Sequence, residues 1–444
     1  MKKREIILVI AVIAFGVIYN SVKSGDIHFY SGCSPDSREL LDRKYPVEFP
    51  QKEIQYVVNE TDAALRKLKI NNPAGDIEVG KSIDNTIRIT PVIRVYHKDK
   101  GKAGDISTGI KLVARETGEK ITIDVESNQR FPYHRARLGF KCLIPAKVEL
   151  ELTNRYGNID INDMGRDIDI DARHGDVFVK NVESPVKVKN YDGLVRLYDI
   201  KGPIQLDSSH SRVKIRNAPS LNLKCSHADL FIADVKEGIE ITYAGYSDLE
   251  IENAGHLKIA AKLTKMKLVK ITGGVVVANT HEPISMTDIQ GDIDIKARQC
   301  RIEVSKAVGD FLKVQNSYSY VGIAGFSGNT LDANLEHGEL DVTFENIRGK
   351  ININASYADV TLKYPETTEP AFTINSANGK ILNSTTARLT VREDREKRWL
   401  KTLEGKPQIT IDTKYADVFL KNITELPAEA ETTGNLPAEK EIQL

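Results

Sequence analysis

The sequence repeats a short apolar pattern about every 18 residues, and this period limits the possible folds more than any other feature. Each repeat begins with an apolar residue of a short segment in which apolar and polar residues alternate. These first residues are Ile159, Val177, Val195, Val213, Leu230, Leu249, Leu268, Ile284, Ile302, Val321, Leu340 and Val360. A second alternating segment follows in each repeat, as at Ile168 and Ile170. The pattern extends over residues 154–375.

Alternation of apolar and polar residues is the signature of a half-buried β-strand, and each segment has only four or five residues. The turns between segments are rich in Gly, Asp and Asn. Two such strands cannot bury their own apolar faces, but stacked copies can share one continuous core. We therefore predict an all-β fold, a single-chain β-solenoid (β-helix) of about twelve short coils. A β-sandwich is the alternative, but it does not require the same residue type at the same position of every repeat.

Aspartate and asparagine alternate four residues after the start of each of the first six repeats. This column reads Asp163, Asn181, Asp199, Asn217, Asp234 and Asn253, and it continues with Thr272 and Asp288. Stacking would oppose these side chains directly, where like charges are unfavourable. Alternation avoids that repulsion and lets each Asn donate a hydrogen bond to an Asp. We interpret the column as a structural ladder. A calcium site is the alternative, although no dense acidic loop with calcium-ligand spacing occurs.

A second column, three residues before each repeat begins, is rich in aromatic rings. Its members are Tyr156, His174, His210, His227, Tyr246, Tyr318, His337 and Tyr357. Asp192, with Tyr191 beside it, Lys265 and Gln299 interrupt the column, and Tyr415 holds the same position in a late repeat. Rings at one corner of a solenoid can stack on one another and protect the turn. Alternatively, they form a ligand-stacking column for sugar faces. Two neighbouring His could also bind a transition metal weakly, although no third ligand is visible.

The first residues form an apolar segment with a basic start. Lys2, Lys3 and Arg4 precede an uninterrupted apolar run over residues 6–19. No small-x-small cleavage site follows, so we predict an uncleaved signal anchor over residues 1–22. The run is shorter than the ~20 residues of a typical membrane span, and a buried helix of a soluble protein is the alternative. With the basic residues in the cytoplasm, the bulk of the chain would be extracytoplasmic, which predicts a single-pass protein of the cell membrane.

Four cysteines are scattered along the chain, at Cys33, Cys142, Cys225 and Cys300. No CxxC pair occurs, so the cysteines do not indicate a zinc or redox site, and we expect free thiols. The segment YSGC that ends at Cys33 offers lipidation as an alternative, but Tyr30 stands where an aliphatic residue is usual. We therefore expect no metal site and no cofactor.

Several repeats share the motif G-D-I-x-V or a close variant. It occurs as AGDIEV at 74–79, YGNIDI at 156–161, HGDVFV at 174–179, QGDIDI at 290–295 and YADVFL at 415–420. With the strand CLIPAKVELEL that precedes the repeats, these motifs resemble the bacterial putative-adhesin β-strand-repeat domain family over roughly residues 65–422. The resemblance implies a β-solenoid, an extracytoplasmic location and a role in adhesion or envelope structure, and it implies no catalytic residues. This chain differs in placing Tyr or His where small polar residues are commoner, and in having more repeats.

The remaining segments lie before and after the repeats. Residues 23–64 carry three prolines and mixed charge, and we interpret them as a stalk or linker. Residues 65–153 contain strand patterns at looser spacing, which predicts a β-rich N-terminal cap over the open end of a solenoid. After the repeats at 154–375, residues 376–422 are predicted to form an insertion or flap and a closing coil. Residues 423–444 are polar and rich in Pro and Glu, which predicts a disordered tail.

Neither composition nor motifs indicate catalysis. Lys+Arg and Asp+Glu both number 62, and the net charge of +0 argues against a nucleic-acid partner. No G-x-S-x-G, H-E-x-x-H or P-loop motif occurs, and short coils leave little room for the facing carboxylates of a glycosidase cleft. We therefore predict a non-enzymatic, adhesin-like binding or structural module of the cell envelope, with cell-wall glycan or an envelope protein as partner. The alternative is the ectodomain of an envelope-stress or signalling system that works through a membrane partner. A polysaccharide-active enzyme is less favoured.

Overall fold

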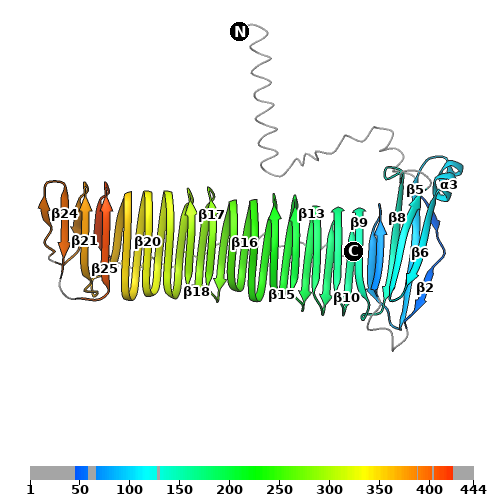
Figure 1. Cartoon of the computed structure of the whole chain (residues 1–444), viewed down its shortest axis with the longest axis horizontal. Helices are drawn as coiled ribbons and strands as arrows, with labels where there is room; N and C mark the ends of the chain where they lie inside the picture. Colours follow the sequence, from blue (N-terminus) through cyan, green and yellow to red (C-terminus); the bar gives the residue numbers. More distant parts are fainter. Residues whose placement is uncertain (1–45, 59–66, 128–130, 388, 403–404, 424–444) are drawn as a thin grey trace, which may run out of the picture.

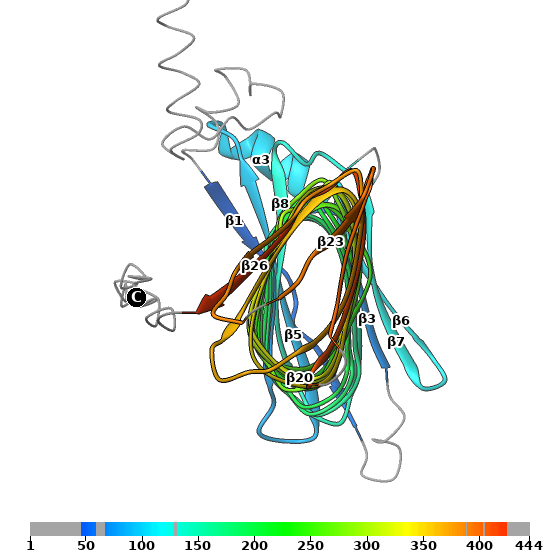
Figure 2. The same cartoon turned by 90° about the vertical axis from the view of Figure 1, so that its left-hand side faces the viewer.

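The structure, a computed structural model, describes residues 46–58, 67–127, 131–387, 389–402 and 405–423. These residues form an elongated rod of β-strands stacked side by side (Figure 1). Seen along the rod, the strands superimpose as a flattened oval with two long sides (Figure 2). Except for α3 (Lys100–Thr108), the described elements are strands. The prediction of an all-β repeat fold is therefore confirmed at the level of fold class.

The predicted signal anchor at 1–22 lies outside the described residues, as do Cys33 and the tail from residue 424 onward. Within the described ranges, no helix is long and apolar enough to cross a membrane. Part of the predicted stalk, at 46–58, is described and carries two of the strands at the N-terminal end of the rod.

Each turn of the chain contributes one strand to each long side of the oval, which we call face A and face B. On face A, Ile159 pairs in parallel with Val177 of the next turn. On face B, Ile168 pairs in the same way with Val186. Both pairs join residues 18 positions apart, so the period of the sequence is the length of one coil.

The strands of the repeating region fall into three groups. Face A contains β4 (Ile77–Lys81), β10 (Ile159–Met164), β12 (Val177–Val182), β18 (Ile284–Gln290), β22 (Ile381–Ser384) and β26 (Val418–Ile423). Face B contains β3 (Lys67–Asn72), β9 (Glu149–Tyr156), β11 (Ile168–His174), β14 (Ile204–Ser209), β17 (Val275–Thr280), β19 (Ile293–Arg298), β21 (Ala371–Ala377) and β25 (Gln408–Lys414). Longer strands continue around the corners and contribute to both faces: β13 (Val186–Ile200), β15 (Ser211–Ser226), β16 (Asp229–Ile271) and β20 (Ile302–Pro365).

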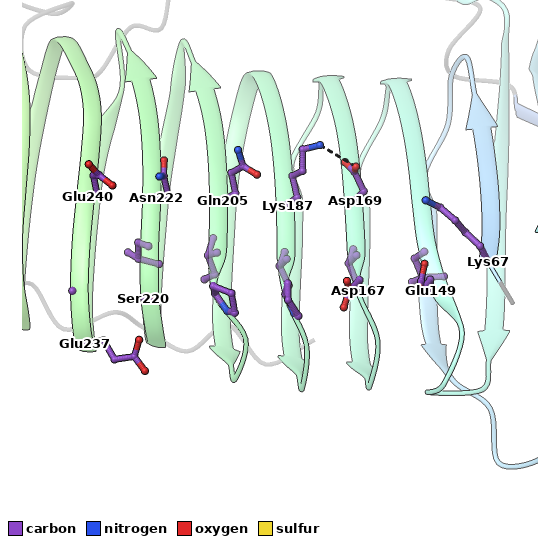
Figure 3. Close-up of a pocket in the computed structure, with 18 of the residues that line it drawn as sticks. Lys67, Glu149, Asp167, Asp169, Lys187, Gln205, Ser220, Asn222, Glu237 and Glu240 are labelled. Atoms are coloured by element: carbon purple, nitrogen blue, oxygen red, sulfur yellow. Dashed lines mark hydrogen bonds and ion pairs between the residues drawn. The ribbon is translucent and has the colours of Figure 1, made fainter. Parts of the chain in front are cut away.

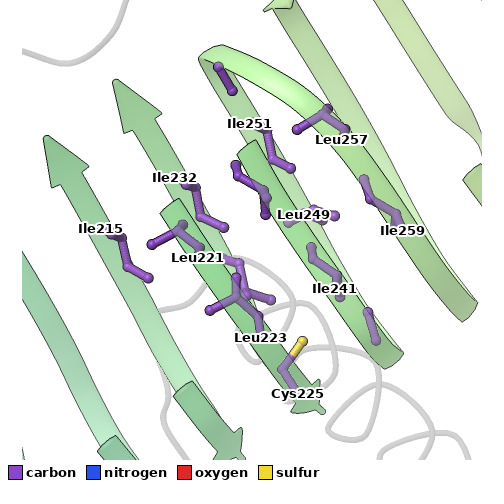
Figure 4. Close-up of a cluster of buried hydrophobic side chains, with 14 of the residues drawn as sticks. Ile215, Leu221, Leu223, Cys225, Ile232, Ile241, Leu249, Ile251, Leu257 and Ile259 are labelled. Carbon is purple, nitrogen blue, oxygen red and sulfur yellow. The ribbon is translucent and has the colours of Figure 1, made fainter. Parts of the chain in front are cut away.

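Aliphatic side chains fill the space between the two faces. In the middle of the rod, Ile215, Ile232 and Ile251 of face A point into the same interior as Leu223 and Ile241 of face B (Figure 4). None of these five residues is more than 1% exposed. Full burial of such a side chain contributes roughly 1.5–3 kcal/mol, and each coil obtains it only from its neighbours. The stack is therefore one continuous core.

The motif G-D-I-x-V forms the turn from face B to face A, and the contacts between coils explain its first two residues. A side chain on Gly157, where φ is 139°, would overlap the carbonyl group of Gly75 in the neighbouring coil. The residue after the glycine accepts a backbone hydrogen bond from the next coil. Asn158 N donates to Asp76 Oδ1 at 2.8 Å, and Asp176 N donates to Asn158 Oδ1 at 2.9 Å. The motif thus fixes the register of successive coils.

The predicted ladder of Asp and Asn forms as a series of pairs. The side-chain hydrogen bonds run from Asn181 to Asp163 at 3.0 Å, from Asn217 to Asp199 at 2.9 Å and from Asn253 to Asp234 at 2.6 Å. All six residues have positive φ, a conformation that Asn and Asp adopt more readily than other non-glycine residues. The column therefore joins adjacent coils by hydrogen bonds, which agrees with its interpretation as a structural ladder.

The observed register corrects two positions assigned from the sequence. Met266, not Leu268, begins the face A strand of its coil, because Met266 pairs with Ile284. The residue four positions later is consequently Lys270, which has a φ of 54°, and not Thr272. Both Met266 and Leu268 point inward in a long alternating segment, so alternation alone does not separate the two choices.

At the N-terminal end, a later part of the chain encloses the first coil. β3 lies between β9 and β7 (Lys120–Ser127), and β4 lies between β10 and β8 (Ala136–Ile144). Antiparallel pairs then extend this end through β1 (Pro46–Pro50), β2 (Ile54–Val57), β5 (Thr86–Tyr96) and β6 (Ile110–Thr117). The segment predicted as a cap thus contains the first coil of the stack and the strands that cover it.

At the C-terminal end, the last coil in the sequence is not the last coil in space. β25 pairs with β20 on one side and with β21 on the other, and β26 lies between β20 and β22 in the same way. β24 (Lys397–Lys401) then covers β21 as an antiparallel strand and forms a hairpin with β23 (Arg392–Asp394). The expected closing coil is therefore inserted within the stack, and the hairpin closes it.

Candidate functional site

Two corners of the oval carry the candidate binding residues, and the first is the turn from face B to face A, which we call the ring corner. It holds the predicted aromatic column, whose rings stack in runs with interplanar angles of 2–14°. The ring centroids are separated by 5.0 Å for Tyr156–His174, 4.8 Å for His210–His227, 5.0 Å for His227–Tyr246, 4.8 Å for Tyr318–His337, 4.9 Å for His337–Tyr357 and 5.0 Å for Tyr357–Tyr415. The structure thus brings all the predicted rings to one corner.

The column is first interrupted between His174 and His210, in the coil that carries Asp192. Here Tyr191 partly replaces the missing ring. Its ring lies 6.0 Å from that of His174 at 82° and 5.3 Å from that of His210 at 44°. His174 Nδ1 lies 3.5 Å from Asp192 Oδ2. The aromatic contact therefore continues through this coil, but with a change of ring orientation.

A longer interruption lies between Tyr246 and Tyr318. It holds Leu263, His281 and Gln299, each with positive φ, as have the ring residues on both sides. A non-glycine residue in this left-handed region costs roughly 1–2 kcal/mol. The same backbone conformation is therefore kept at this corner even where no ring stack accompanies it.

The structure corrects one predicted residue of this interruption and adds another. Lys265 was predicted to lie in the column, but Leu263 has the positive φ at this turn, 53°. His281 was not predicted to lie in the column, although it stands three residues before Ile284, the first residue of its repeat. His281 precedes Gln299 by one 18-residue period, and that spacing is the signal by which it could have been found.

Stacking limits what the ring corner can bind. Within a run, each ring covers a face of the next, so a sugar could stack only where a run ends. Tyr246 and Tyr318 are such ends, and they are 55% and 51% exposed. The exposed ring edges offer hydroxyl and imidazole groups for hydrogen bonding along the corner. Among the described residues, no group of three His, Cys, Asp or Glu is arranged to hold a metal ion.

The opposite turn, from face A to face B, is hollowed, and we call it the groove corner (Figure 3). An open groove of about 750 Å³ runs along it across consecutive strands of face B. One wall is a row of outward side chains that lie opposite one another in register. This row is Asp169, Lys187, Gln205, Asn222 and Glu240. No sequence motif marked this groove.

The groove exists because small or compact residues begin the strands of face B. Pro185 and Pro203 occupy this position in two coils, and Ser220 pairs with Gly238 in the next two. A side chain on Gly238 would overlap the ring of His256, which therefore lies over this glycine at one end of the groove. The hollow thus exists because none of these positions carries a large side chain.

The centre of the groove is polar and uncharged. Lys187 Nζ lies 3.2 Å from Asp169 Oδ2, so these two charges neutralise each other. Gln205 and Asn222 follow in the row, and neither amide hydrogen-bonds another described residue. A free amide both donates and accepts hydrogen bonds. The pair is therefore suited to a ligand with hydroxyl or amide groups.

Glu151 lies near the N-terminal end of the groove, among three lysines. Its carboxylate is 2.7 Å from Lys69 Nζ, 3.0 Å from Lys67 Nζ and 3.3 Å from Lys120 Nζ. Hydrogen bonds, first from Lys69 and then from Lys67 and Lys120, outweigh partial burial and lower the pKa of Glu151 to about 2. The carboxylate is therefore ionised at neutral pH and links β3, β7 and β9.

The cysteines in the described part of the chain are free thiols in the core. Cys142, Cys225 and Cys300 are buried and form no disulfide. Burial raises the pKa of Cys142 and of Cys225 to about 12. These two thiols are therefore protonated at neutral pH and lack the thiolate that a nucleophile requires.

Comparison with known proteins supports the repeat fold but gives no activity. Residues 239–421 match the family model described as Toastrack DUF4097, a domain of unknown function. The resemblance to β-strand-repeat domains is thereby confirmed for this part of the chain. Among solved structures, the chain is similar to a putative cell adhesion protein from Clostridium sporogenes, with 9% identity and a TM-score of 0.16, over 84% of this chain and 100% of that one. A TM-score this low defines no shared fold. No curated protein matches the sequence.

Proposed function

We propose that this protein is a membrane-tethered, extracytoplasmic β-solenoid that acts as an adhesin-like binding module of the cell envelope and not as an enzyme. The groove corner carries the proposal. A small-molecule site usually encloses most of its ligand in a pocket. This groove is instead open along the rod and crosses successive coils, so it suits an extended chain that is bound by many weak contacts.

The composition of the groove favours a polymer rich in hydroxyl groups, such as cell-wall glycan. Its wall repeats at the spacing of parallel strands, roughly 4.8 Å, so a chain laid along the rod would meet a polar side chain at every step. The central amides of Gln205 and Asn222 can exchange hydrogen bonds with hydroxyl groups. The charge of Lys187 is already neutralised by Asp169, which favours a neutral ligand.

The membrane tether is inferred from the sequence of residues 1–22, with the basic residues on the cytoplasmic side. This orientation would expose the rod to cell-wall glycan and to envelope proteins. The ring corner would add hydrogen-bonding edges on the opposite side of each coil. The family match is consistent with this proposal but supplies no ligand.

The test is sedimentation of the full chain, in nonionic detergent, with purified cell-wall glycan. The groove variant is Gln205→Ala/Asn222→Ala. The control is Gln315→Ala, which removes an outward amide of face B outside the groove. We expect saturable binding that weakens about tenfold in the groove variant, since two hydrogen bonds of about 0.5–1.5 kcal/mol are lost. The control should bind like the wild type.

Two results would contradict the proposal: absence of saturable binding to glycan, or equal binding by the groove variant and the wild type. A second variant, His210→Asn/His227→Asn, separates the ring corner from the groove, because Asn tolerates positive φ and keeps the turn intact. A parallel binding assay with detergent-extracted membrane proteins tests the alternative. If the wild type binds a membrane protein and no glycan, the chain is instead the ectodomain of an envelope-signalling system.

A further inference from the structure

Face A carries a compact group of basic side chains in the first half of the rod, which we call the cationic cluster. It consists of Lys180, Arg196, Arg212, Lys214 and Arg216. These residues come from three consecutive coils, on β12, β13 and β15. Their side chains all belong to the outward set of face A, between buried residues of the same strands. The cluster lies away from the groove, whose wall is on face B.

The cluster brings cations of adjacent coils together. Some outward lysines elsewhere contact a carboxylate on the adjacent coil, as Lys258 does Glu240 at 2.8 Å and Lys267 does Glu250 at 2.8 Å. In the cluster, Arg196 lies directly opposite Lys214. Like charges opposed across two strands are destabilising. The fold tolerates this electrostatic cost here, as it does where Arg94 lies opposite Arg137.

Most of the cluster is also free of internal neutralisation. Within the described part of the chain, Lys180, Arg196 and Arg212 form no ion pair, although Asp229 lies opposite Arg212 on the next strand. Arg216 contacts a ring instead of a carboxylate, with Cζ 5.1 Å from the centroid of Phe231. The guanidinium groups thus keep the hydrogen-bonding capacity with which arginine recognises carboxylate, sulfate and phosphate.

Aromatic rings lie among these cations. Phe178 and Tyr198 form an edge-to-face pair with centroids 5.9 Å apart, and each lies opposite a member of the cluster. A hollow of about 320 Å³ adjoins the cluster; Arg212, Lys214 and Phe231 line it together with the carboxylates of Asp229, Asp248 and Glu250. Rings beside cations provide an apolar contact for the carbon faces of a sugar as well as a charge contact for its acidic groups.

We propose that the cationic cluster binds an acidic polysaccharide, a linear chain whose sugars carry carboxylate or sulfate groups. Arg196 and Lys214 follow one another along the rod, so a chain parallel to the rod meets successive cations one strand spacing apart. A flat anionic membrane fits less well, because Asp160 and Glu250 border the cluster on the same face. This site goes beyond the proposed function, since it is on another face and takes a charged ligand.

The test measures binding of the full chain in detergent to polygalacturonate and to heparin, with neutral dextran and single-stranded DNA as comparisons. The cluster variant is Arg196→Gln/Arg212→Gln. The control is Arg298→Gln/Arg348→Gln, which removes the same charge from exposed arginines elsewhere. We expect saturable binding of at least one acidic polysaccharide, a rise of tenfold or more in Kd for the cluster variant, and less than twofold for the control.

Thermal unfolding keeps this result interpretable. The cluster variant removes a like charge opposite Lys214 and an opposite charge opposite Asp229, so these two surface changes should offset each other and its Tm should match that of the wild type. A matching Tm excludes misfolding as the cause of lost binding. The inference is overturned if neither acidic polymer binds saturably, if the cluster variant binds like the wild type, or if single-stranded DNA binds as tightly as the polysaccharides. Loss of acidic-polymer binding in Gln205→Ala/Asn222→Ala, with binding kept in the cluster variant, would also overturn it and assign the polymer to the groove.

Discussion

The two corners of each coil differ in the size of the side chains that meet between neighbouring coils. At the ring corner, large side chains stack on the equivalent residues of neighbouring coils, as His210 does on His227 at 4.8 Å. At the groove corner, Pro203, Ser220 and Gly238 leave a continuous hollow. Both arrangements repeat with the coil. The ring corner satisfies its side chains within the protein, whereas the groove corner leaves polar groups available to a ligand.

This difference indicates where function can reside in a repeat protein. Repetition brings like residues together, and residues that pack or hydrogen-bond with their own copies contribute to the stack. The ladder of Asn181 and Asp163 is an example. Residues that repeat without such partners, such as the amides of Gln205 and Asn222, are the better candidates for binding. Substitutions at four positions test this contrast, from the largest expected effect on stability to the smallest.

Gly175→Val should be the most damaging change at the ring corner. Its new side chain would overlap the carbonyl group of Gly157, at a φ of 151° that valine rarely adopts. We expect a loss of about 3 kcal/mol or more in the free energy of unfolding, since overpacking and backbone strain add. Denaturant unfolding measures it, with Gly104→Val as the control, because nothing lies within 4 Å of that position. Equal stability of the two variants would refute this account of the motif.

His210→Ala and His210→Asn separate the ring stack from the backbone turn. His210 has a φ of 53°, which asparagine tolerates better than alanine. We expect a loss of about 1–2 kcal/mol for alanine and about half of that for asparagine, because only alanine adds backbone strain to the lost ring contacts. Thermal unfolding compares the two variants. If the alanine variant is as stable as the asparagine variant, backbone strain at this position does not contribute to the loss of stability.

Glu151→Gln tests the carboxylate beside the groove through its pH dependence. The pKa of Glu151 is lowered to about 2 in the fold, against roughly 4.3 in an unfolded chain. The ion pairs therefore contribute stability above about pH 4.3, and this contribution is lost as pH falls toward 2. We expect the variant to be less stable at pH 7 by at most about 1 kcal/mol, because the side chain is partly solvated. Urea midpoints of variant and wild type should converge near pH 2; a constant difference would argue against the ion pairs as its cause.

Gly238→Ala should change stability least while altering the groove. The added methyl group would overlap the ring of His256, a side chain that can move, so we expect a change within about 0.5 kcal/mol. The displaced ring would narrow the groove, and glycan binding should weaken severalfold in the sedimentation assay. Unchanged binding would show that this end of the groove makes no contact with ligand.

Sequence alone predicts the regular part of this molecule well. The period reports the length of the coil, and residues at one phase, such as Tyr318 and His337, are neighbours in space because parallel pairing preserves phase. The period does not locate a strand start within a long stretch of alternation. Met266 and Leu268 lie in such a stretch, and nothing in the sequence marks that the face A strand begins at Met266.

The ends and the groove could not be predicted in this way. A strand has the same pattern of alternation whichever coil it joins, so nothing in β25 indicates that it lies between β20 and β21. The groove is produced by small residues at the groove corner, and glycine, serine and proline there are equally typical of ordinary turns. Its free amides become recognisable only when the register shows that no neighbour hydrogen-bonds them.

The most direct test of the central claim is the dependence of affinity on ligand length. The groove crosses the strands that begin near Glu149 and near His256, and six strand spacings of roughly 4.8 Å give a length of about 30 Å. Titration calorimetry of the full chain with cell-wall glycan fragments of increasing length would measure it. If the rod binds an extended polymer, affinity should rise with each added sugar until the fragment spans about 30 Å and should then remain constant. Equal affinity for the shortest and the longest fragments would contradict the account, because it would place recognition at a single point.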